Sequence, residues 1–322
     1  MIIDRAVIEV NGGCNYRCEM CPQSAPGGRG KAWLKKMPLN RFAQLLDEIQ
    51  PSLVNLEGSG EPTLNRDLDK YIEACSARGI RSHIVSNGFN MRGQLMKRCV
   101  DAGLTFFRFS VIGYDQLSYS KWMAKDAFAA VLENAIAMQE YSNGRTVVAS
   151  YHLILDNDRI DFEVEQYKQN FIEKAGTAAE IWKMHNWSGV YSTHYARNGA
   201  VSSCGRPFSP DVVIRANGKV HPCCQVLGND DAAVLGDINE NTVEEIFYGK
   251  EYEALRQSHR SGNFPDYCKN CDFLINDPEV LVYTNCDRSI DHMTGTQFSL
   301  KDYRGDFSSV QSNNINCTEI LS

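Results

Sequence analysis

Three cysteines near the start of the chain have a spacing that suits metal-cluster chemistry. Cys14, Cys18 and Cys21 form the pattern C-x3-C-x2-C, which follows Asn11-Gly12-Gly13. Three thiolates can ligate three irons of a [4Fe–4S] cube, whereas an electron-transfer cube takes four. Because no fourth cysteine lies nearby, the spacing predicts one iron open to a substrate or cofactor. Zinc is the alternative, but it favours C-x2-C pairs, and the next cysteine, Cys75, lies in a helix-like apolar pattern.

This three-cysteine motif resembles that of the radical S-adenosylmethionine (SAM) superfamily. The resemblance implies that the open iron chelates the amino and carboxylate groups of SAM, and that Met20 lies against the adenine. It also implies an external reductant, such as flavodoxin or ferredoxin, as a partner.

Composition limits the other classes of partner. The chain has 322 residues, 43% of them apolar, enough for a large core and, we expect, two domains. The net charge is -7, and Lys and Arg are scattered, so neither nucleic acid nor a membrane surface is predicted as the principal partner. The N-terminus lacks signal-peptide character and no apolar run reaches transmembrane length, which predicts a cytoplasmic protein. In that reducing compartment twelve cysteines favour metal or cluster ligation over disulfides.

Apolar periodicity predicts six strands that alternate with helices. The strands are expected at 4–10, 53–56, 81–85, 106–111, 146–155 and 180–184, and the helices at 38–49, 68–77, 91–102, 127–141 and 162–175. Such alternation implies an α/β fold with a parallel sheet and right-handed crossovers. Six units fit the partial (β/α)6 barrel that the resemblance implies better than a closed eight-fold barrel.

The carboxyl ends of such strands are where function gathers. Gly58-Ser59-Gly60-Glu61-Pro62 resembles the family's Gly-Gly-Glu-Pro segment, with Ser59 in place of a glycine. Ser86-Asn87-Gly88 resembles its Thr-Asn-Gly, and Ser110 ends the fourth strand. A glycine-rich segment alone is usually a turn, but three of them follow consecutive strands here. The SAM contacts implied by the resemblance are Met20, Ser59, Gly60, Glu61, Ser86, Asn87 and Ser110.

A second group of cysteines follows in the C-terminal third. Asn217-Gly218 between two β-rich runs predicts a hairpin, and short helices are expected at 243–247 and 252–258. Cys204, Cys223, Cys268 and Cys271 resemble the auxiliary-cluster ligands of the SPASM and twitch subgroup, and Leu235 to Phe247 matches that subgroup's usual connection. One auxiliary [4Fe–4S] cluster is implied, because fourteen residues separate Cys271 from the next cysteine, Cys286. A four-cysteine zinc site is the alternative, and Cys224 could replace Cys223 as ligand.

These elements predict three regions. They are the radical SAM partial barrel over 1–190, a twitch-like or SPASM-like auxiliary domain over 191–275, and a tail over 276–322 that lacks apolar periodicity. Residues 185–203 are expected to form a linker that lines the mouth of the barrel.

The function implied is a radical SAM enzyme that cleaves SAM to a 5′-deoxyadenosyl radical and takes hydrogen from a small sugar-, aminocyclitol- or nucleoside-like substrate. Oxidation by a dehydrogenase is favoured, with His152, His185 or Lys183 as a possible base. The alternatives are an epimerase whose hydrogen donor is Cys224, Cys286 or Cys317, and a peptide maturase. The first strand begins at residue 4, which leaves no room for a leader-binding domain and favours the small substrate. A non-catalytic iron–sulfur electron carrier would not explain Glu61, Asn87 and Ser110.

Overall fold

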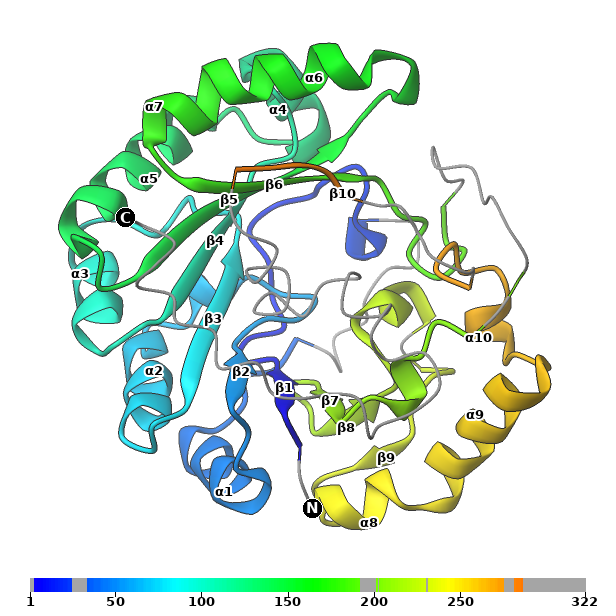
Figure 1. The fold of residues 1–322 in the computed structure, drawn as a ribbon. Helices are drawn as coiled ribbons and strands as arrows, with labels where there is room; N and C mark the ends of the chain where they lie inside the picture. The colour runs from blue at the N-terminus through cyan, green and yellow to red at the C-terminus, as the bar shows by residue number, and fades with distance from the viewer. Residues whose placement is uncertain are drawn as a thin grey trace.

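A curved parallel sheet forms the centre of the molecule in the computed structural model, which describes residues 3–24, 34–191, 201, 203–229, 231–274 and 281–285. Six strands pair in parallel in the order of the chain (Figure 1). They are β1 (Arg5–Ile8), β2 (Leu53–Asn55), β3 (Arg81–Ser86), β4 (Phe106–Ser110), β5 (Val147–Ile154) and β6 (Ala178–Lys183). The sheet does not close, and the predicted partial barrel is confirmed.

Helices cover the convex face of this sheet (Figure 1). They are α1 (Leu39–Ile49), α2 (Leu68–Ser76), α3 (Gly93–Asp101), α4 (Gln116–Met123), α5 (Phe128–Ser142), α6 (Ile160–Tyr167) and α7 (Glu173–Ala175), the last two joined by a π-helical turn. In α1, Phe42, Leu45, Leu46 and Ile49 are buried, as the 3.6-residue period predicts. None of the helices in the described residues is long and apolar enough to cross a membrane.

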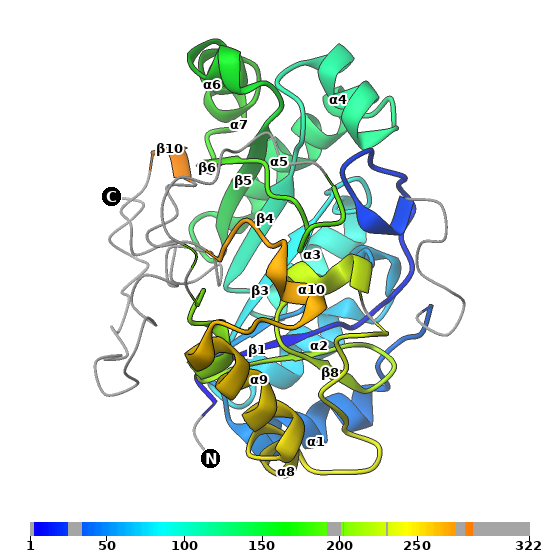
Figure 2. The same ribbon diagram turned by 90° about the vertical axis from the view of Figure 1, so that its right-hand side faces the viewer.

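The C-terminal third continues the same sheet. Strand β7 (Asp211–Ile214) pairs with β1 in parallel, and β8 (Lys219–His221) and β9 (Gly236–Asp237) follow in antiparallel order. The turn between β7 and β8 holds Gly218 at a φ of 92°, which confirms the predicted hairpin. The helices α8 (Val243–Phe247), α9 (Lys250–Ser261) and α10 (Asp266–Lys269) follow. Helices α8 and α9 lie at the end of the sheet opposite α6 and α7 (Figures 1 and 2).

Helices α4 and α10 and strands β9 and β10 were not predicted from the sequence. Helix α4 was not predicted, because it buries only Tyr119 and Met123 and depends instead on a capping box between Asp115 and Ser118. Strand β10 (Leu281–Thr284) lies within the tail for which no periodicity was expected, and it pairs antiparallel with the edge strand β6. Its side chains are all half-buried, so it carries no alternating pattern.

Candidate active site and iron–sulfur cysteines

One cavity opens inside the curve of the sheet at the carboxyl ends of the strands. It is bounded by the loop that follows β1, by β2 to β6, and on the open side by β7 and the segment after β8. The seven residues predicted to contact SAM all line it: Met20, Ser59, Gly60, Glu61, Ser86, Asn87 and Ser110. Parallel strands end at one edge of a sheet, so residues far apart in the chain meet there.

The three N-terminal cysteines line the same cavity. Burial raises the pKa of Cys14 to about 11, and the negative charge of Cys21 adds to that rise. Burial also raises the pKa of Cys18, and again the charges of its two partner cysteines add to the effect. The three thiols are thus close neighbours, with an all-sulfur donor set that fits three iron ligands of a cube. Within the described ranges, no three His, Cys, Asp or Glu side chains converge as they would around a single metal ion.

The segment after β2 packs backbone to backbone against the cysteine loop. The N–H of Glu61 donates to the carbonyl of Gly13 at 2.7 Å, and the side chain of Asn11 donates to the carbonyls of Gly13 and Glu61 at 2.8 and 2.9 Å. A Cβ added to Gly60 would lie 2.0 Å from the carbonyl oxygen of Asn11. Glycine is therefore required at position 60 because another backbone occupies the space of a side chain.

The buried carboxylate of Glu9, which the sequence analysis did not single out, binds the segment after β2 through hydrogen bonds. Glu9 Oε1 accepts hydrogen bonds from the N–H and hydroxyl of Ser59, both at 2.7 Å, and from the N–H of Gly60 at 3.3 Å. Its Oε2 accepts from the N–H of Ala216, just beyond β7, at 3.0 Å. Ser59 thus gains a hydrogen bond that the glycine usual in this motif could not make. Glu9 joins this segment to the C-terminal third.

Glu61 connects the implied SAM-binding segments to each other. Its Oε1 accepts from the N–H and hydroxyl of Thr63 at 3.0 and 2.6 Å and from the hydroxyl of Ser86 at 2.6 Å, and its Oε2 accepts from the N–H of Asn87 at 2.9 Å. The side chain of Asn87 in turn donates to Asn15 in the cysteine loop at 2.9 Å. Burial raises the pKa of Glu61, while these donors oppose the rise.

Replacing Glu61 with Ala should weaken SAM binding. The resemblance implies that the carboxylate of Glu61 accepts a hydrogen bond from the amino group of SAM. A hydrogen bond between charged groups is worth about 1.5–3 kcal/mol, so its loss corresponds to roughly a 10- to 150-fold rise in the dissociation constant of SAM. Calorimetric titration of the reconstituted protein with SAM measures it. Exposed Glu140 on α5 provides the control Glu140→Ala. A SAM dissociation constant that stays at the parent value in the Glu61 variant would contradict this role.

The four C-terminal cysteines form a second group. Burial raises the pKa of Cys223 to about 12, and the charges of Cys224 and Cys204 add to that rise. Burial raises the pKa of Cys268 and Cys271 as well, and Cys204 and Cys223 act on both. The sulfur atoms of Cys204, Cys223, Cys268 and Cys271 are close enough to influence one another's charge, and four such donors fit a complete set of ligands for a second cube. Cys224 instead lines the central cavity, whereas Cys223 does not.

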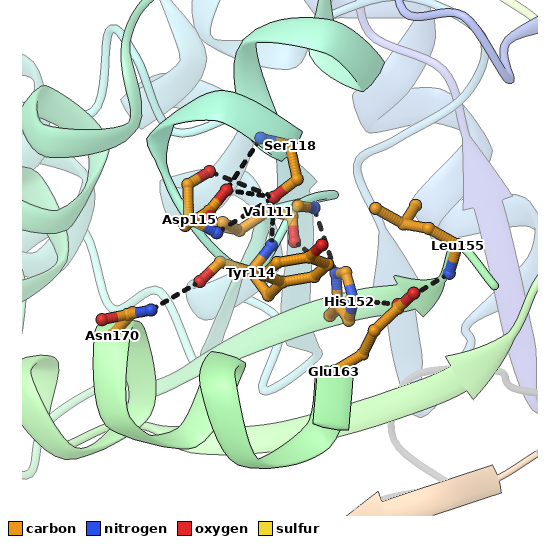
Figure 3. Close-up of polar contacts among 9 residues, drawn as sticks. Val111, Tyr114, Asp115, Ser118, His152, Leu155, Glu163 and Asn170 are labelled. Atoms are coloured by element: carbon orange, nitrogen blue, oxygen red, sulfur yellow. Dashed lines mark hydrogen bonds and ion pairs between the residues drawn. The ribbon is translucent and has the colours of Figure 1, made fainter. Parts of the chain in front are cut away.

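His152 does not line the cavity, and Figure 3 shows it in contact with Val111 and Glu163 instead. It faces the helices, where Nδ1 lies 3.1 Å from the N–H of Gly113 and 3.2 Å from the carbonyl of Val111, and Nε2 lies 3.5 Å from Glu163. Its ring stacks on Tyr167 at 4.8 Å. The pleat of β5 explains this, because its neighbours Tyr151 and Leu153 point into the cavity.

The other two bases suggested by the sequence, His185 and Lys183, differ in whether they line the cavity. His185 lines the cavity beside Trp187, and burial lowers its pKa to about 4. Residues 192–200 and 202 of the linker expected over 185–203 lie outside the described residues. Lys183 is half-buried and does not line the cavity. Cys286 and Cys317 lie outside the described residues.

Comparisons with known proteins agree with this geometry. Residues 8–164 match the model of the radical SAM superfamily, and residues 204–272 match the SPASM iron–sulfur cluster-binding domain. A solved structure of BtrN in complex with AdoMet and 2-DOIA aligns with 84% of this chain and 93% of that one, at a TM-score of 0.58 and 20% identity. Streptococcus suis SuiB bound to precursor peptide SuiA aligns with 85% of this chain and 70% of that one, at a TM-score of 0.60 and 15% identity.

Two curated relatives also match. An uncharacterised protein of Methanocaldococcus jannaschii, MJ0804, is 24% identical over 168 residues, which is 52% of this chain and only about half, 54%, of that protein's length. The GTP 3′,8-cyclase of Helicobacter pylori is 22% identical over 267 residues. The match covers 69% of this chain and 80% of the length of the cyclase.

The two family matches define an iron–sulfur enzyme of the radical SAM class. The chain belongs to the radical SAM superfamily, in the subgroup with a C-terminal SPASM or twitch region, as the sequence predicted. Membership implies a [4Fe–4S] cluster, SAM and an auxiliary iron–sulfur cluster, and both cysteine groups fit these cofactors.

Proposed function

We propose that this protein oxidises a small sugar-, aminocyclitol- or nucleoside-like substrate by two electrons. Cys14, Cys18 and Cys21 would hold the cluster that binds SAM, and the second cysteine group would hold the auxiliary cluster. When bound, the first cluster and SAM supply a 5′-deoxyadenosyl radical that removes a hydrogen atom from an unactivated C–H bond. An external reductant of the flavodoxin or ferredoxin type would deliver the electron for this cleavage.

One observation carries the proposal: a single cavity extends from the N-terminal cysteines to Cys224, the immediate neighbour of Cys223. A substrate in this cavity lies between the two cysteine groups. A carbon radical beside a hydroxyl becomes a carbonyl when it loses one proton and one electron. The electron requires a one-electron acceptor, and an iron–sulfur cluster with four protein ligands has no open site for substrate but can accept an electron.

The proton requires an acceptor that reaches the cavity. Of the three bases that the sequence suggested, only His185 lines it. Burial in apolar surroundings holds the pKa of His185 near 4, so the ring is neutral at pH 7 but a weak proton acceptor.

Epimerisation is a second candidate, because Cys224 lines the cavity as a thiol outside the group of four. An epimerase would return a hydrogen atom from this thiol to the opposite face of the substrate radical. The product would then have the same oxidation state as the substrate.

The two outcomes separate in deuterated water. The reduced, reconstituted protein would be incubated with SAM and, separately, scyllo-inosamine, glucosamine and adenosine, following 5′-deoxyadenosine by chromatography and the product by mass spectrometry. We expect a two-electron-oxidised product without deuterium at the reacting carbon, retained in Cys224→Ala and in the core control Cys99→Ala. A singly deuterated product of unchanged oxidation state that only Cys224→Ala abolishes would identify an epimerase instead.

A further inference from the structure

The segment just after β2 and the strands β3 and β4 place an acidic, a small apolar and a basic side chain in a row on the cavity wall. Val85 of β3 pairs directly with Arg108 of β4, and Asn55 of β2 pairs with His83. Glu57 is two residues beyond Asn55, so it faces the same side as Asn55 and lies beside Val85. Adjacent strands are about 4.8 Å apart, which separates the backbones of Glu57 and Arg108 by roughly 10 Å. All three side chains line the cavity.

The charge of Arg108 is already compensated. Its Nη1 lies 2.5 Å from Glu180 Oε2, and the guanidinium stacks over the ring of Tyr151 at 4.7 Å. Its Nε is nevertheless buried without a hydrogen-bond partner in the described part of the chain. Arg108 therefore retains a donor for a neutral oxygen, while its positive charge is balanced by Glu180.

Glu57 differs, because its charge has no close counterion. Its Oε1 accepts a hydrogen bond from Asn55 at 3.3 Å, the backbone N–H of Val85 also acts on the carboxylate, and among the described residues no donor lies within hydrogen-bond distance of its buried Oε2. It takes part in no ion pair among those residues either. Burial raises its pKa, and the charge of Arg108 only partly opposes the rise. A buried carboxylate in this state is stabilised by a cation placed against it.

We propose that Glu57, Val85 and Arg108 form the substrate-recognition seat of this enzyme, and that the seat selects an amino-polyol. The ammonium group binds Glu57, and the oxygen of a nearby hydroxyl accepts a hydrogen bond from Arg108. The short side chain of Val85 leaves room for the carbon skeleton between them. This inference rests on the proposed function, because it assumes that the substrate occupies this cavity.

The carboxylate of Glu57 disfavours a phosphorylated substrate at this seat. A phosphate would meet the carboxylate of Glu57, while Arg108 is engaged by Glu180. Elsewhere on the cavity wall, Arg5 and Arg206 share the single carboxylate of Asp211, at 3.2 and 2.7 Å. Arg215 is a further cation there, so a phosphate is disfavoured at the place of Glu57 and not in the cavity as a whole. An uncharged polyol would leave the charge of Glu57 without a counterion.

Equilibrium binding tests the seat without turnover. The SAM-loaded holoenzyme would be titrated calorimetrically, without reductant, with scyllo-inosamine, scyllo-inositol and myo-inositol 1-phosphate. We expect the amine to bind at least tenfold more tightly than the other two. Glu57→Gln should reduce that preference to about twofold or less. Val85→Leu fills the space between the side chains of Glu57 and Arg108, so it should weaken the binding of the amine at least tenfold.

Two measurements keep these variants interpretable. SAM affinity of Glu57→Gln and Val85→Leu should stay within about twofold of the parent, which shows that the site is folded, and Glu140→Gln should bind all three probes like the parent. Tightest binding of the phosphate or the neutral polyol, no binding of the amine, or a preference retained in Glu57→Gln would overturn the proposal. Absence of any oxidised product, with the amine preference intact, would instead count against the proposed oxidation alone.

Discussion

Replacing Cys14, Cys18 and Cys21 together with Ala should abolish SAM cleavage while leaving a second cluster in place. The three thiols line the central cavity, whereas Cys223 belongs to a separate group that does not line it. Without its three ligands the first cube cannot bind, so reductive cleavage of SAM has no electron source. We expect 5′-deoxyadenosine to fall below detection, and iron to fall to about half if both sites hold cubes of the same size.

Iron analysis and EPR of the reduced variant measure the cluster that remains. A double variant, Cys75→Ala with Cys99→Ala, controls for the loss of cysteines, because both residues are buried in helices away from the cavity. This control should keep both clusters and SAM cleavage. A triple variant that loses all its iron, or that still cleaves SAM, would refute the assignment of two separate clusters.

Replacing Asp211 with Ala should destabilise the fold by about 3–5 kcal/mol, the usual cost of removing one partner of a buried ion pair. Asp211 lies on β7, and its two carboxylate oxygens accept from Nε and Nη2 of Arg5 on β1, each at 3.2 Å. Arg206 donates to the same carboxylate at 2.7 Å. The variant leaves the buried Arg5 and the partly buried Arg206 without this counterion.

Urea unfolding of the parent and the variant under the same anaerobic conditions gives the difference in the free energy of unfolding. Asp101→Ala is the matched control, because Asp101 forms an ion pair with Arg145 at 2.9 Å in which both side chains are about half exposed. Ion pairs of this exposed kind contribute about 0–1 kcal/mol to the free energy of unfolding, so this control should lose little stability. Equal losses in the two variants would mean that the pair between Arg5 and Asp211 does not stabilise the joint between β1 and β7.

The sequence predicted the parts of the site that are encoded locally. The cysteine spacing and the segments around Glu61 and Asn87 each occupy a few consecutive residues, and parallel strands bring such segments together without further information. The orientation of His152 was open to the same reasoning, since strict alternation with Tyr151 and Leu153 places it on the opposite face.

Other parts of the site depend on contacts between distant residues. Glu9 binds Ala216, and Glu57 belongs to a row completed by Val85 and Arg108, so neither is distinguished by its immediate neighbours in the sequence. The choice between Cys223 and Cys224 as a member of the second group depends on which way each side chain points after β8. Strand β10 is stabilised by pairing with β6 rather than by its own pattern.

The pairing of β1 with β7 has a consequence for how the protein is made. Arg5 and Asp211 are 206 positions apart, so one edge of the first strand lacks its partner until most of the chain has left the ribosome. At about 5–20 residues per second this takes roughly 10–40 s. During that interval the loop with the first three cysteines is attached to an incomplete sheet, and Glu9 cannot yet bind Ala216. The contact from Glu9 to Ala216 therefore forms only after β7 has been made. Nascent chains that stop before β7 would present an unpaired edge of β1 to other proteins.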